Sequence, residues 1–561
     1  MPRQYLVTAA LPYSNGRLHV GHIAGAYLPA DIFVRYLRAR GDDVLFICGS
    51  DDNGVAITIS AAKEGLTSAE VVAKYHNRQE QDFAALGIAI DVFGGTHTPG
   101  YVDRHVKVSQ EFFTSIHDKG YFTKKTIKQL FDAQASRFLP DRYVMGTCYY
   151  PDCNHPRAYG DLCENCGRSM EPLLLKNPKS VLTGSTPEVR ETTHWFLRLN
   201  DFQEPLREWL SAKTDWRPTV RNFALGQVNE GLPERAMTRD LEWGIPVPLD
   251  DPDAKGKVLY VWFDAPIGYV SFTSQLLETR GGHRDDYEKW WKNPDCKIFH
   301  FIGEDNIVFH ALIWPAMLMA EGTYQLPEAV VANSFLNIKF PGDEEERKIG
   351  KSEGNAVWIE DFLKEYDPDP LRYYLTAIAP EGARTPYQPE EFIQRNDGEL
   401  VATFGNFVNR LVPFCHKNFE GKVPAAGNRD ARDNDVLSLR RVQADRAAEQ
   451  LEACRFKAAL AEVMELARAG NAYLAEKEPW KQRKVDLAAC ATTINVGLQI
   501  ARTLTSIMQP FLPFSARKLA AMLSLDDRAF AWNSATEELP DGHGLGEAVP
   551  LFRKLVPNPT H

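Results

Sequence analysis

The amino-acid sequence predicts an α/β protein in which a parallel sheet is split by an inserted domain and followed by a C-terminal α-helical bundle. Three observations support this prediction. Two apolar runs, at residues 5–10 and 43–48, flank a segment with helical spacing, as in a parallel strand–helix–strand unit. Further buried-strand patterns appear much later, at residues 258–263 and 297–302. From about residue 391 onward almost every segment has helical periodicity.

The helix of the first unit has clear ends. Helical spacing begins near His19 and continues through the apolar residues Ile23, Tyr27, Ala30, Phe33 and Leu37. Gly41 stands where a C-terminal cap belongs, because glycine adopts the left-handed cap conformation without strain. The motif that precedes this helix therefore lies at the carboxyl end of the first strand.

At 561 residues the chain is too long for one hydrophobic core, and its patterns divide it into five parts. We expect a Rossmann-like domain at 1–118 and 237–328, split by an inserted connective domain at 119–236, then a linker domain at 329–390 and a helical domain at 391–561. The linker is expected to begin with a strand over residues 329–340, after a helix over residues 307–321.

The composition is that of a soluble globular protein, with 44% hydrophobic and 25% charged residues. No stretch approaches the roughly 20 apolar residues of a membrane helix, and no signal peptide is recognisable at the N-terminus. The cysteines number nine, and five of them are scattered singly, which favours a reducing compartment and hence the cytoplasm. The net charge of −11 argues against nonspecific coating of nucleic acid, but local basic residues could still dock a polyanion.

The first candidate motif is Leu11-Pro-Tyr-Ser-Asn-Gly-Arg-Leu-His-Val-Gly-His22. It places two histidines at a helix N-terminus, which attracts anions, beside the sheet edge where open α/β folds bind ligands. Gly21 has no Cβ, so a flat base could lie on the backbone. On its own a His-x-Gly-His string is too short to exclude two ordinary histidines.

The second candidate motif is Lys348-Ile-Gly-Lys-Ser352, in a loop that ends at Asn355. Two lysines three residues apart can hold a triphosphate and stabilise charge that develops on it. A solvated basic loop is the better interpretation of a lone lysine pair. The two motifs together are much more specific than either one.

In this order and separation, the two motifs resemble the His-Ile-Gly-His and Lys-Met-Ser-Lys-Ser signatures of class I aminoacyl-tRNA synthetases. Ile349-Gly350 replaces the Met-Ser pair of the second signature. Longer strings resemble the methionyl-tRNA synthetase family from about residue 4 to residue 550. These strings are Ala10-Leu-Pro-Tyr-Ser-Asn-Gly16, Gly49-Ser-Asp-Asp-Asn-Gly54, Tyr260-Val-Trp-Phe-Asp-Ala-Pro-Ile-Gly-Tyr269, Phe301-Ile-Gly-Glu-Asp305 and Phe309-His310.

The resemblance implies an ATP site and a methionine site. Catalytic roles fall to His19, His22, Lys348 and Lys351, and ATP binding to these four with Gly21, Gly303, Asp305 and Ser352. Methionine binding falls to Ala10, Leu11, Tyr13, Asp51, Trp262, Ala265, Pro266, Tyr269 and His310, with Asp51 binding the ammonium group. Asn53 departs from the histidine that is usual in the family, and Glu304 stands where a basic residue is often found.

The reaction implied by the resemblance has two steps. The carboxylate of L-methionine attacks the α-phosphate of ATP, and pyrophosphate leaves from the methionyl-adenylate. The 3′ end of tRNA(Met), initiator or elongator, then accepts methionine for translation initiation and elongation. The substrate supplies the nucleophile, so the protein positions reactants and stabilises phosphate charge, with Mg²⁺ travelling with ATP.

A cysteine cluster lies in the expected insertion. Cys148, Cys153, Cys163 and Cys166 have the C-x4-C-x9-C-x2-C spacing of a structural zinc site, one ion per chain. The family usually has C-x2-C as its first pair, so His155 could replace Cys153 as a ligand. A degenerate knuckle without metal is the other interpretation.

In the helical domain, the resemblance assigns anticodon recognition to Asn406, Arg410, Pro479 and Trp480. A tryptophan flanked by bases suits an unpaired nucleotide, although Pro-Trp could simply begin a helix. No extra dimerising domain follows the bundle in this sequence, so we expect a monomer.

Three alternatives remain. The first is a class I synthetase for Leu, Ile, Val or Cys, although the insertion is short for a large editing domain. The second is a noncatalytic tRNA-binding relative, against which the retained motif residues argue. The third is a zinc-dependent nucleotidyltransferase, which would not need the helical domain.

Overall fold

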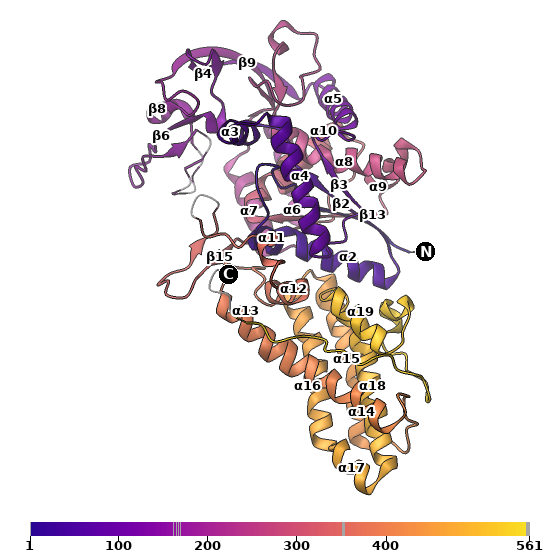
Figure 1. Ribbon diagram of the computed structural model, residues 1–561. Coiled ribbons are helices and arrows are strands. Elements are labelled where there is room, and N and C mark those ends of the chain that lie inside the picture. The colour runs from indigo at the N-terminus through magenta and orange to yellow at the C-terminus, as the bar shows by residue number, and fades with distance from the viewer. Residues whose placement is uncertain are drawn as a thin grey trace.

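The computed structural model describes residues 2–556, apart from residues 161, 164, 167, 169 and 351–353. The molecule is elongated, with an α/β region at one end and a helical region that reaches to α17 (Pro479–Val485) at the other (Figure 1). Among the described residues, no helix has the length and apolar character needed to span a membrane.

The central sheet has five parallel strands in the order β14-β13-β1-β2-β3. Their bounds are β1 (Gln4–Ala9), β2 (Asp43–Ser50), β3 (Val92–Gly95), β13 (Cys296–Gly303) and β14 (Ala329–Asn333). The predicted strands at 5–10, 43–48 and 297–302 are thus confirmed. Strands β1 and β13 are neighbours in this sheet, with Gln4 opposite Cys296, although the insertion lies between β3 and β13 in the chain.

Helices cover both faces of the sheet. They are α1 (Val20–His22), the π-helix η1 (Ile23–Tyr27), α2 (Leu28–Arg40), α4 (Ser68–Ala85), α5 (Val102–Asp118), α8 (Val261–Thr279), α9 (Glu288–Trp291), the π-helix η8 (Phe309–Ile313) and α10 (Trp314–Glu321). Helix α3 (Val55–Glu64) packs on α4. Alternate residues of β1 face opposite cores: Tyr5 and Val7 pack with α2, whereas Leu6 packs with α8 and α10. The expected cap at Gly41 is present, with φ of 90°.

Where the structure describes it, the insertion contains two small antiparallel sheets and two α-helices. One sheet has the order β10-β9-β4-β5, with β4 (Phe122–Asp132), β5 (Arg137–Phe138), β9 (Glu188–Leu197) and β10 (Arg235–Ala236). The other has the order β7-β6-β8, with β6 (Val144–Thr147), β7 (Ala158–Tyr159) and β8 (Lys176–Ser180). The helices are α6 (Gln203–Ala212) and α7 (Pro218–Glu230).

The strand predicted over residues 258–263 is mostly wrong. Only Val258–Leu259 form a strand, β12, and it pairs with β11 (Thr238–Arg239) rather than with the central sheet. Helix α8 begins at Val261 and is buried over most of its length. A short apolar run fits a buried strand and a buried helix equally well, and here the helix packs on β2 and β3.

The strand predicted over residues 329–340 is broken in two. After β14 the chain leaves the central sheet, and β15 (Leu336–Ile338) joins a separate sheet of order β16-β15-β17 with β16 (Arg347–Lys348) and β17 (Thr385–Tyr387). Both strands are mostly buried, so their apolar residues read as one continuous run and nothing in the sequence pattern shows where the chain passes from one sheet to the other. Helices α11 (Ile359–Phe362) and α12 (Pro368–Ala377) complete this part.

The helical region confirms the prediction from residue 391 onward. It contains α13 (Pro389–Arg395), the π-helix η9 (Asn396–Gly405), α14 (Asn406–Asn418), α15 (Ala431–Glu452), α16 (Phe456–Lys477), α17, α18 (Leu487–Ile507) and α19 (Pro513–Met522). Its core is continuous with the core on the α2 face of the sheet. The two regions therefore share one hydrophobic interior.

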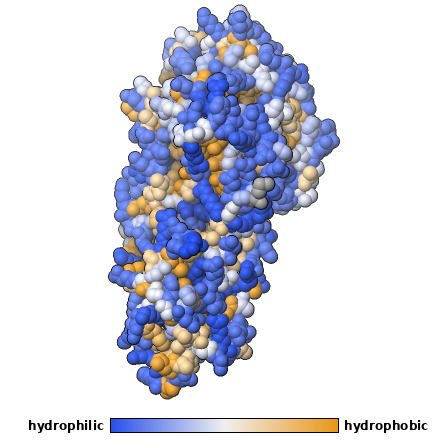
Figure 2. Space-filling view, turned by 90° about the vertical axis from the view of Figure 1, so that its right-hand side faces the viewer, coloured by the Kyte–Doolittle hydropathy of each residue, from blue (hydrophilic) through white to orange (hydrophobic). Residues whose placement is uncertain are grey.

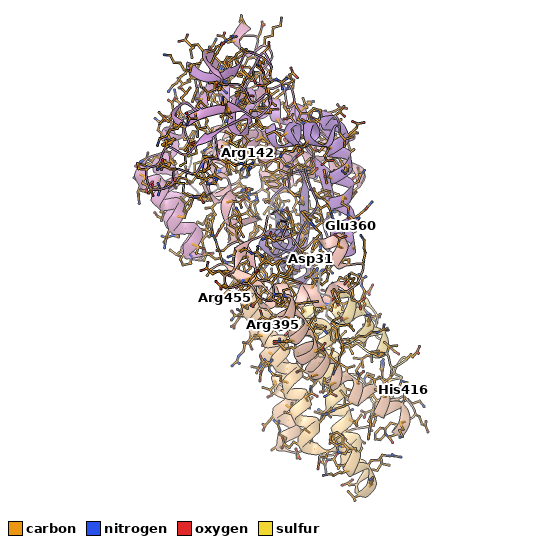
Figure 3. The ribbon with its side chains drawn as sticks, turned by 60° about the vertical axis from the view of Figure 1, so that its left-hand side comes forward. Asp31, Arg142, Glu360, Arg395, His416 and Arg455 are labelled. Carbon is orange, nitrogen blue, oxygen red and sulfur yellow. The ribbon has the colours of Figure 1, made fainter. Side chains whose placement is uncertain are left out.

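A buried arginine joins the two regions. Arg372 of α12 donates to Asp31 Oδ2 (2.6 Å) on α2 and to the carbonyl oxygens of Phe511 (2.8 Å) and Pro510 (3.0 Å). Figure 3 labels Asp31 at this junction. Burial alone would raise the pKa of Asp31, yet Arg35 and Arg372 hold it below its usual value.

Candidate active site

The two histidines of the first motif form the start of the helix that follows β1. The Nδ1 atom of His19 accepts a hydrogen bond from the backbone N–H of Gly21 (3.1 Å), and Nδ1 of His22 accepts one from the backbone N–H of His19 (3.1 Å). Their rings stack with centroids 3.7 Å apart. A ring nitrogen that accepts from an N–H carries no hydrogen, so each neutral ring has its hydrogen on Nε2 and can donate it to an anion.

The two motifs meet in space. A Cβ atom at Gly21 would lie 3.4 Å from Cδ1 of Ile349, so the lysine loop begins directly against the histidine motif. The backbone N–H of Val20 also donates to the carbonyl oxygen of Val357 (3.0 Å), just after that loop. Ile349 is only 7% exposed, which makes it an apolar contact between the motifs.

The base of the lysine loop is closed by one buried amide. Asn355 donates from Nδ2 to the carbonyl oxygen of Lys348 (2.9 Å), and its Oδ1 accepts from the backbone N–H of Gly350 (2.9 Å). Lys348 lies at the end of β16. Lys351 and Ser352, which the sequence also assigned to ATP, lie outside the described residues.

An apolar cavity lies beside the carboxyl ends of β1 and β2. It is lined by Ala10, Leu11, Asp51, Trp262, Ala265, Pro266, Tyr269, Asn306, Phe309 and His310, and its volume is about 20 Å³. Trp262 stacks on Phe309 with ring centroids 3.8 Å apart and meets Tyr13 edge-on. Eight of the nine residues that the sequence assigned to methionine therefore line this cavity. The ninth, Tyr13, contacts the lining residue Trp262.

Tyr269 and His310 form the polar part of this cavity. Asn306 O lies 3.2 Å from His310 Nδ1 and can only accept, so Nδ1 donates and Nε2 accepts from the hydroxyl of Tyr269 (3.0 Å). Burial lowers the pKa of His310 to about 4, despite the opposing effect of that carbonyl. At neutral pH the imidazole is uncharged, which suits an uncharged ligand group.

Asp51 is the buried carboxylate of the cavity. The loop after β1 holds its backbone, because Asp51 N donates to Pro12 O (2.9 Å) and Asp51 O accepts from Ser14 N (3.0 Å). Desolvation raises its pKa well above the usual value, and the nearby Asp264 and Asp52 raise it further. A cationic ligand would relieve this repulsion. Asn53, where the family usually has histidine, donates to Asp264 Oδ2 (2.8 Å) instead.

The segment assigned to adenosine follows β13. A Cβ atom at Gly303 would lie 2.7 Å from Oδ1 of Asp305, so a side chain at this position would displace that carboxylate from its present place. Desolvation raises the pKa of Asp305, and Lys348 lowers it while Glu304 raises it. Asp305 is therefore within electrostatic reach of the lysine loop.

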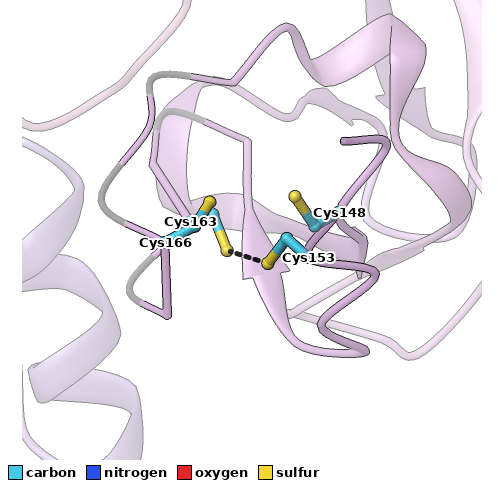
Figure 4. Close-up of side chains that lie close together, drawn as sticks. All are labelled: Cys148, Cys153, Cys163 and Cys166. Carbon is cyan, nitrogen blue, oxygen red and sulfur yellow. Dashed lines mark hydrogen bonds between the residues drawn. The ribbon is translucent and has the colours of Figure 1, made fainter. Parts of the chain in front are cut away.

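The four cysteines of the insertion converge on one point (Figure 4). The sulfur atoms of Cys148, Cys153, Cys163 and Cys166 all lie within 4.8 Å of one another, and those of Cys153 and Cys163 are 3.7 Å apart. Four thiolates around zinc at about 2.3 Å would be about 3.8 Å apart, so the group fits a tetrahedral ion. His155 is not part of this group; its carbonyl oxygen accepts from the N–H of Cys148 (2.8 Å).

The residues assigned to the anticodon lie at the far tip of the helical region. Arg410 of α14 places its guanidinium 5.8 Å from the ring centroid of Trp480 on α17, and Trp480 is 40% exposed. Asn406 begins α14, and Pro479 is buried at the start of α17. Figure 2 shows apolar residues gathered at this tip, where Val485 and Leu487 are also exposed.

The sequence analysis missed two residues of the cavity, Asn306 and Phe309. Phe309 directly precedes His310, and the π-helical turn η8 brings both toward the cavity. The string Phe309-His310 was a usable signal for Phe309. Nothing in the local sequence pointed to Asn306, which acts through its backbone carbonyl.

Comparisons with known proteins agree along the whole chain. The family model "tRNA synthetases class I (M)" matches residues 5–412, and the model "anticodon binding domain of methionyl tRNA ligase" matches residues 423–559. The chain is 46% identical over 558 residues to a methionine–tRNA ligase of Parabacteroides distasonis, covering 99% of this chain and 79% of the relative. It is 45% identical over 564 residues to that of Thermococcus kodakarensis, covering 99% and 74%.

Solved structures give the same result. The fold is similar to that of Mycobacterium tuberculosis methionyl-tRNA synthetase bound by methionyl-adenylate, with a TM-score of 0.80, 25% identity, and coverage of 98% of this chain and 100% of that one. Because both family models match and relatives align with 99% of its length, the chain belongs to the methionyl-tRNA synthetase family of class I tRNA synthetases.

Proposed function

We propose that this chain activates L-methionine with ATP and transfers it to the 3′ end of tRNA(Met), initiator and elongator, through the residues described above. The observation that carries the proposal is the meeting of the histidine motif with the lysine loop, beside an apolar cavity that ends at a buried carboxylate. An amino acid in that cavity would present its carboxylate toward the helix N-terminus, where phosphates are favoured.

His19 and His22 would bind the α-phosphate region through their Nε2–H groups. Lys348 would bind the β- and γ-phosphates together with Lys351 and Ser352, and Gly303 and Asp305 would hold the adenosine. These groups stabilise charge on the phosphates as pyrophosphate leaves, and no protein nucleophile takes part. Mg²⁺ would enter on the phosphates of ATP and neutralise part of their charge.

The cavity would select methionine by shape and polarity. Asp51 would bind the ammonium group, and the aromatic rings would surround the thioether, a contact that contributes about 0.3–1.5 kcal/mol. At about 20 Å³ the cavity holds little more than one water, so side chains of its lining, such as the stacked Trp262 and Phe309, would have to move when methionine enters.

Further assignments complete the proposal. Cys148, Cys153, Cys163 and Cys166 would hold one structural zinc ion, which has no open position for chemistry. Asn406, Arg410, Pro479 and Trp480 would read the anticodon by stacking and charge. The cysteines form no disulfide, which supports a cytoplasmic location, and we propose that the chain is a monomer.

The test is amino-acid-dependent ATP–pyrophosphate exchange, with methionine compared against leucine, isoleucine, valine and cysteine. Exchange with methionine alone supports the assignment. Exchange with another amino acid would keep the reaction and overturn the pocket residues. A folded, metal-loaded sample that exchanges with none of them would favour a noncatalytic tRNA-binding protein.

A further inference from the structure

A second cation lies on the same face as Lys348, at the edge of the proposed phosphate site. In the sheet β16-β15-β17, Lys348 pairs with Asn337 and Thr385 pairs with Leu336. Side chains alternate along a strand, so Phe335 shares the face of Asn337 and Lys348. Phe335 directly precedes β15 and Arg384 directly precedes β17, so the parallel register of these two strands places the two residues side by side. The register thus groups two cations and one ring.

Contacts confirm this grouping. Lys348 Nζ lies 5.0 Å from the ring centroid of Phe335, and Arg384 Cζ lies 5.4 Å from the same centroid. Both distances are within the range of attraction between a cation and an aromatic face. One ring therefore serves as a platform for two positive charges, which would repel each other without a counter-charge.

Glu304 supplies that counter-charge. Its Oε1 atom accepts hydrogen bonds from both Nε (3.0 Å) and Nη2 (2.7 Å) of Arg384. Glu304 stands directly after β13, between Gly303 and Asp305, which we assign to adenosine. An unneutralised carboxylate at this position would repel the triphosphate, and Arg384 removes that repulsion.

We propose that Arg384 is a phosphate-binding residue of the ATP site and that Glu304 positions it there. The inference rests on the proposed function, which places the β- and γ-phosphates at Lys348. The side chain of Arg384 is 58% exposed, so phosphate can reach it. Two of the five N–H donors of Arg384 are bonded to Glu304. The other donors can reach phosphate oxygens while the Phe335 ring holds the guanidinium.

A structural role alone would give a different result. Ion pairs at such exposed sites contribute little to stability, so loss of a purely structural pair would leave the kinetics unchanged. Loss of a phosphate contact would instead weaken ATP binding selectively. The two possibilities are therefore separated by comparing the KM for ATP with the KM for methionine.

The main test is Arg384→Ala in methionine-dependent ATP–pyrophosphate exchange. We expect the KM for ATP to rise about tenfold or more, the usual loss for a charge-assisted hydrogen bond, while the KM for methionine stays within about twofold. Arg384→Lys, which keeps the charge but not the fork of donors, should lie between Arg384→Ala and the wild type. It also covers the case in which Arg384→Ala does not fold.

Arg347→Ala is the matched control. Arg347 precedes Lys348 on β16, is 53% exposed and pairs with Asp343 (3.0 Å). Since it points to the opposite face of the strand, its loss removes the same charge without touching the site. Equal rises in the KM for ATP in Arg347→Ala and Arg384→Ala would overturn the proposal, as would an Arg384→Ala enzyme within twofold of the wild type.

The role of Glu304 is tested by rescue. Glu304→Gln alone should raise the KM for ATP, by less than Arg384→Ala does, because a neutral amide holds the guanidinium less firmly than a carboxylate. Arg384→Ala combined with Glu304→Gln should recover part of the loss, and no recovery would refute the role of Glu304. If the wild type catalyses ATP–pyrophosphate exchange and Arg384→Ala has unchanged kinetics, only this inference is refuted. If the wild type catalyses no exchange, the proposed function is refuted and the inference with it.

Discussion

Neighbouring groups set the protonation of individual side chains at the proposed methionine site. The carbonyl oxygen of Asn306 and the hydroxyl of Tyr269 together define one neutral form of His310. The pKa of the neighbouring His300 is lowered well below its usual value, first by burial and then by His310. The deep end of the cavity is therefore uncharged at neutral pH, and its one carboxylate, Asp51, lies where a cationic group is expected.

The low pKa of His310 predicts a pH dependence of stability. The unfolded chain binds a proton below about 6.5, whereas folded His310 stays neutral until about 4. Unfolding then takes up a proton, so this contribution to stability is complete above pH 6.5 and is lost as the pH falls toward 4, by up to about 1.4 kcal/mol per pH unit.

Urea unfolding of the wild type and of His310→Gln at pH 7 and pH 5 would measure this effect. The wild type should lose more free energy of unfolding between the two pH values than the variant does, since both share every other titrating group. Equal losses in the two proteins would show that His310 does not carry the effect.

Two short elements hold site residues by contacts outside regular secondary structure. The lysine loop is closed by the side chain of Asn355, and the cysteine knuckle is closed by four sulfur atoms around a small core that includes Val144 and Leu175. We therefore expect the conformation of each element to depend on a single polar or metal-binding group.

Removal of the Asn355 amide should disturb the loop and leave the fold intact. Asn355→Ala leaves the Lys348 carbonyl and the Gly350 N–H without their partner, and we expect exchange activity to fall about tenfold. Asn434→Ala, which removes an exposed side-chain–backbone hydrogen bond on α15, is the control and should be near wild type. A large drop in the melting temperature of Asn355→Ala would point to a structural role instead.

Removal of metal should unfold the knuckle before the rest of the chain. The hydrophobic cluster around this unit contains ten buried residues, and some of them, such as Val55 and Leu130, come from outside it, so the apolar core of the knuckle itself is small. We expect about one zinc per chain by elemental analysis, and faster proteolysis near residues 144–180 after chelation. Well under one zinc per folded chain would contradict the metal assignment.

On the scale of the whole molecule, the proposed active site and the proposed anticodon site lie in different regions of an elongated chain (Figure 1). Arg372 and a continuous hydrophobic core connect the regions, so we expect them to keep a fixed separation. An elongated rigid body of this kind can contact a large ligand at two distant points.

Separate sites predict separable losses. Trp480→Ala should reduce charging of tRNA at least about tenfold, since stacking contributes roughly 1–3 kcal/mol per base, and should leave ATP–pyrophosphate exchange nearly intact. Arg410→Ala, which removes the neighbouring cation, should act in the same direction. Loss of both activities in Trp480→Ala would indicate a folding role for that residue.

Much of this architecture could be predicted because its signals are local. The helix after His19, its cap at Gly41 and the strands around it depend on residues within a few positions of each other. The helical character of the C-terminal region follows from periodicity in the same way. The errors occurred where local signals are ambiguous: the apolar run at 258–263 became a helix start, and the one at 329–340 became two strands of different sheets.

The two motifs, the spacing of the cysteines and most of the order of elements could be predicted from the sequence. Tertiary packing was needed to show that Gly21 meets Ile349, that Asn306 orients His310, and that Glu304 holds Arg384 beside Lys348. Each of these contacts except Asn306–His310 joins residues far apart in the chain. Periodicity specifies which face of an element is buried, but the packing of the whole core decides what that face meets.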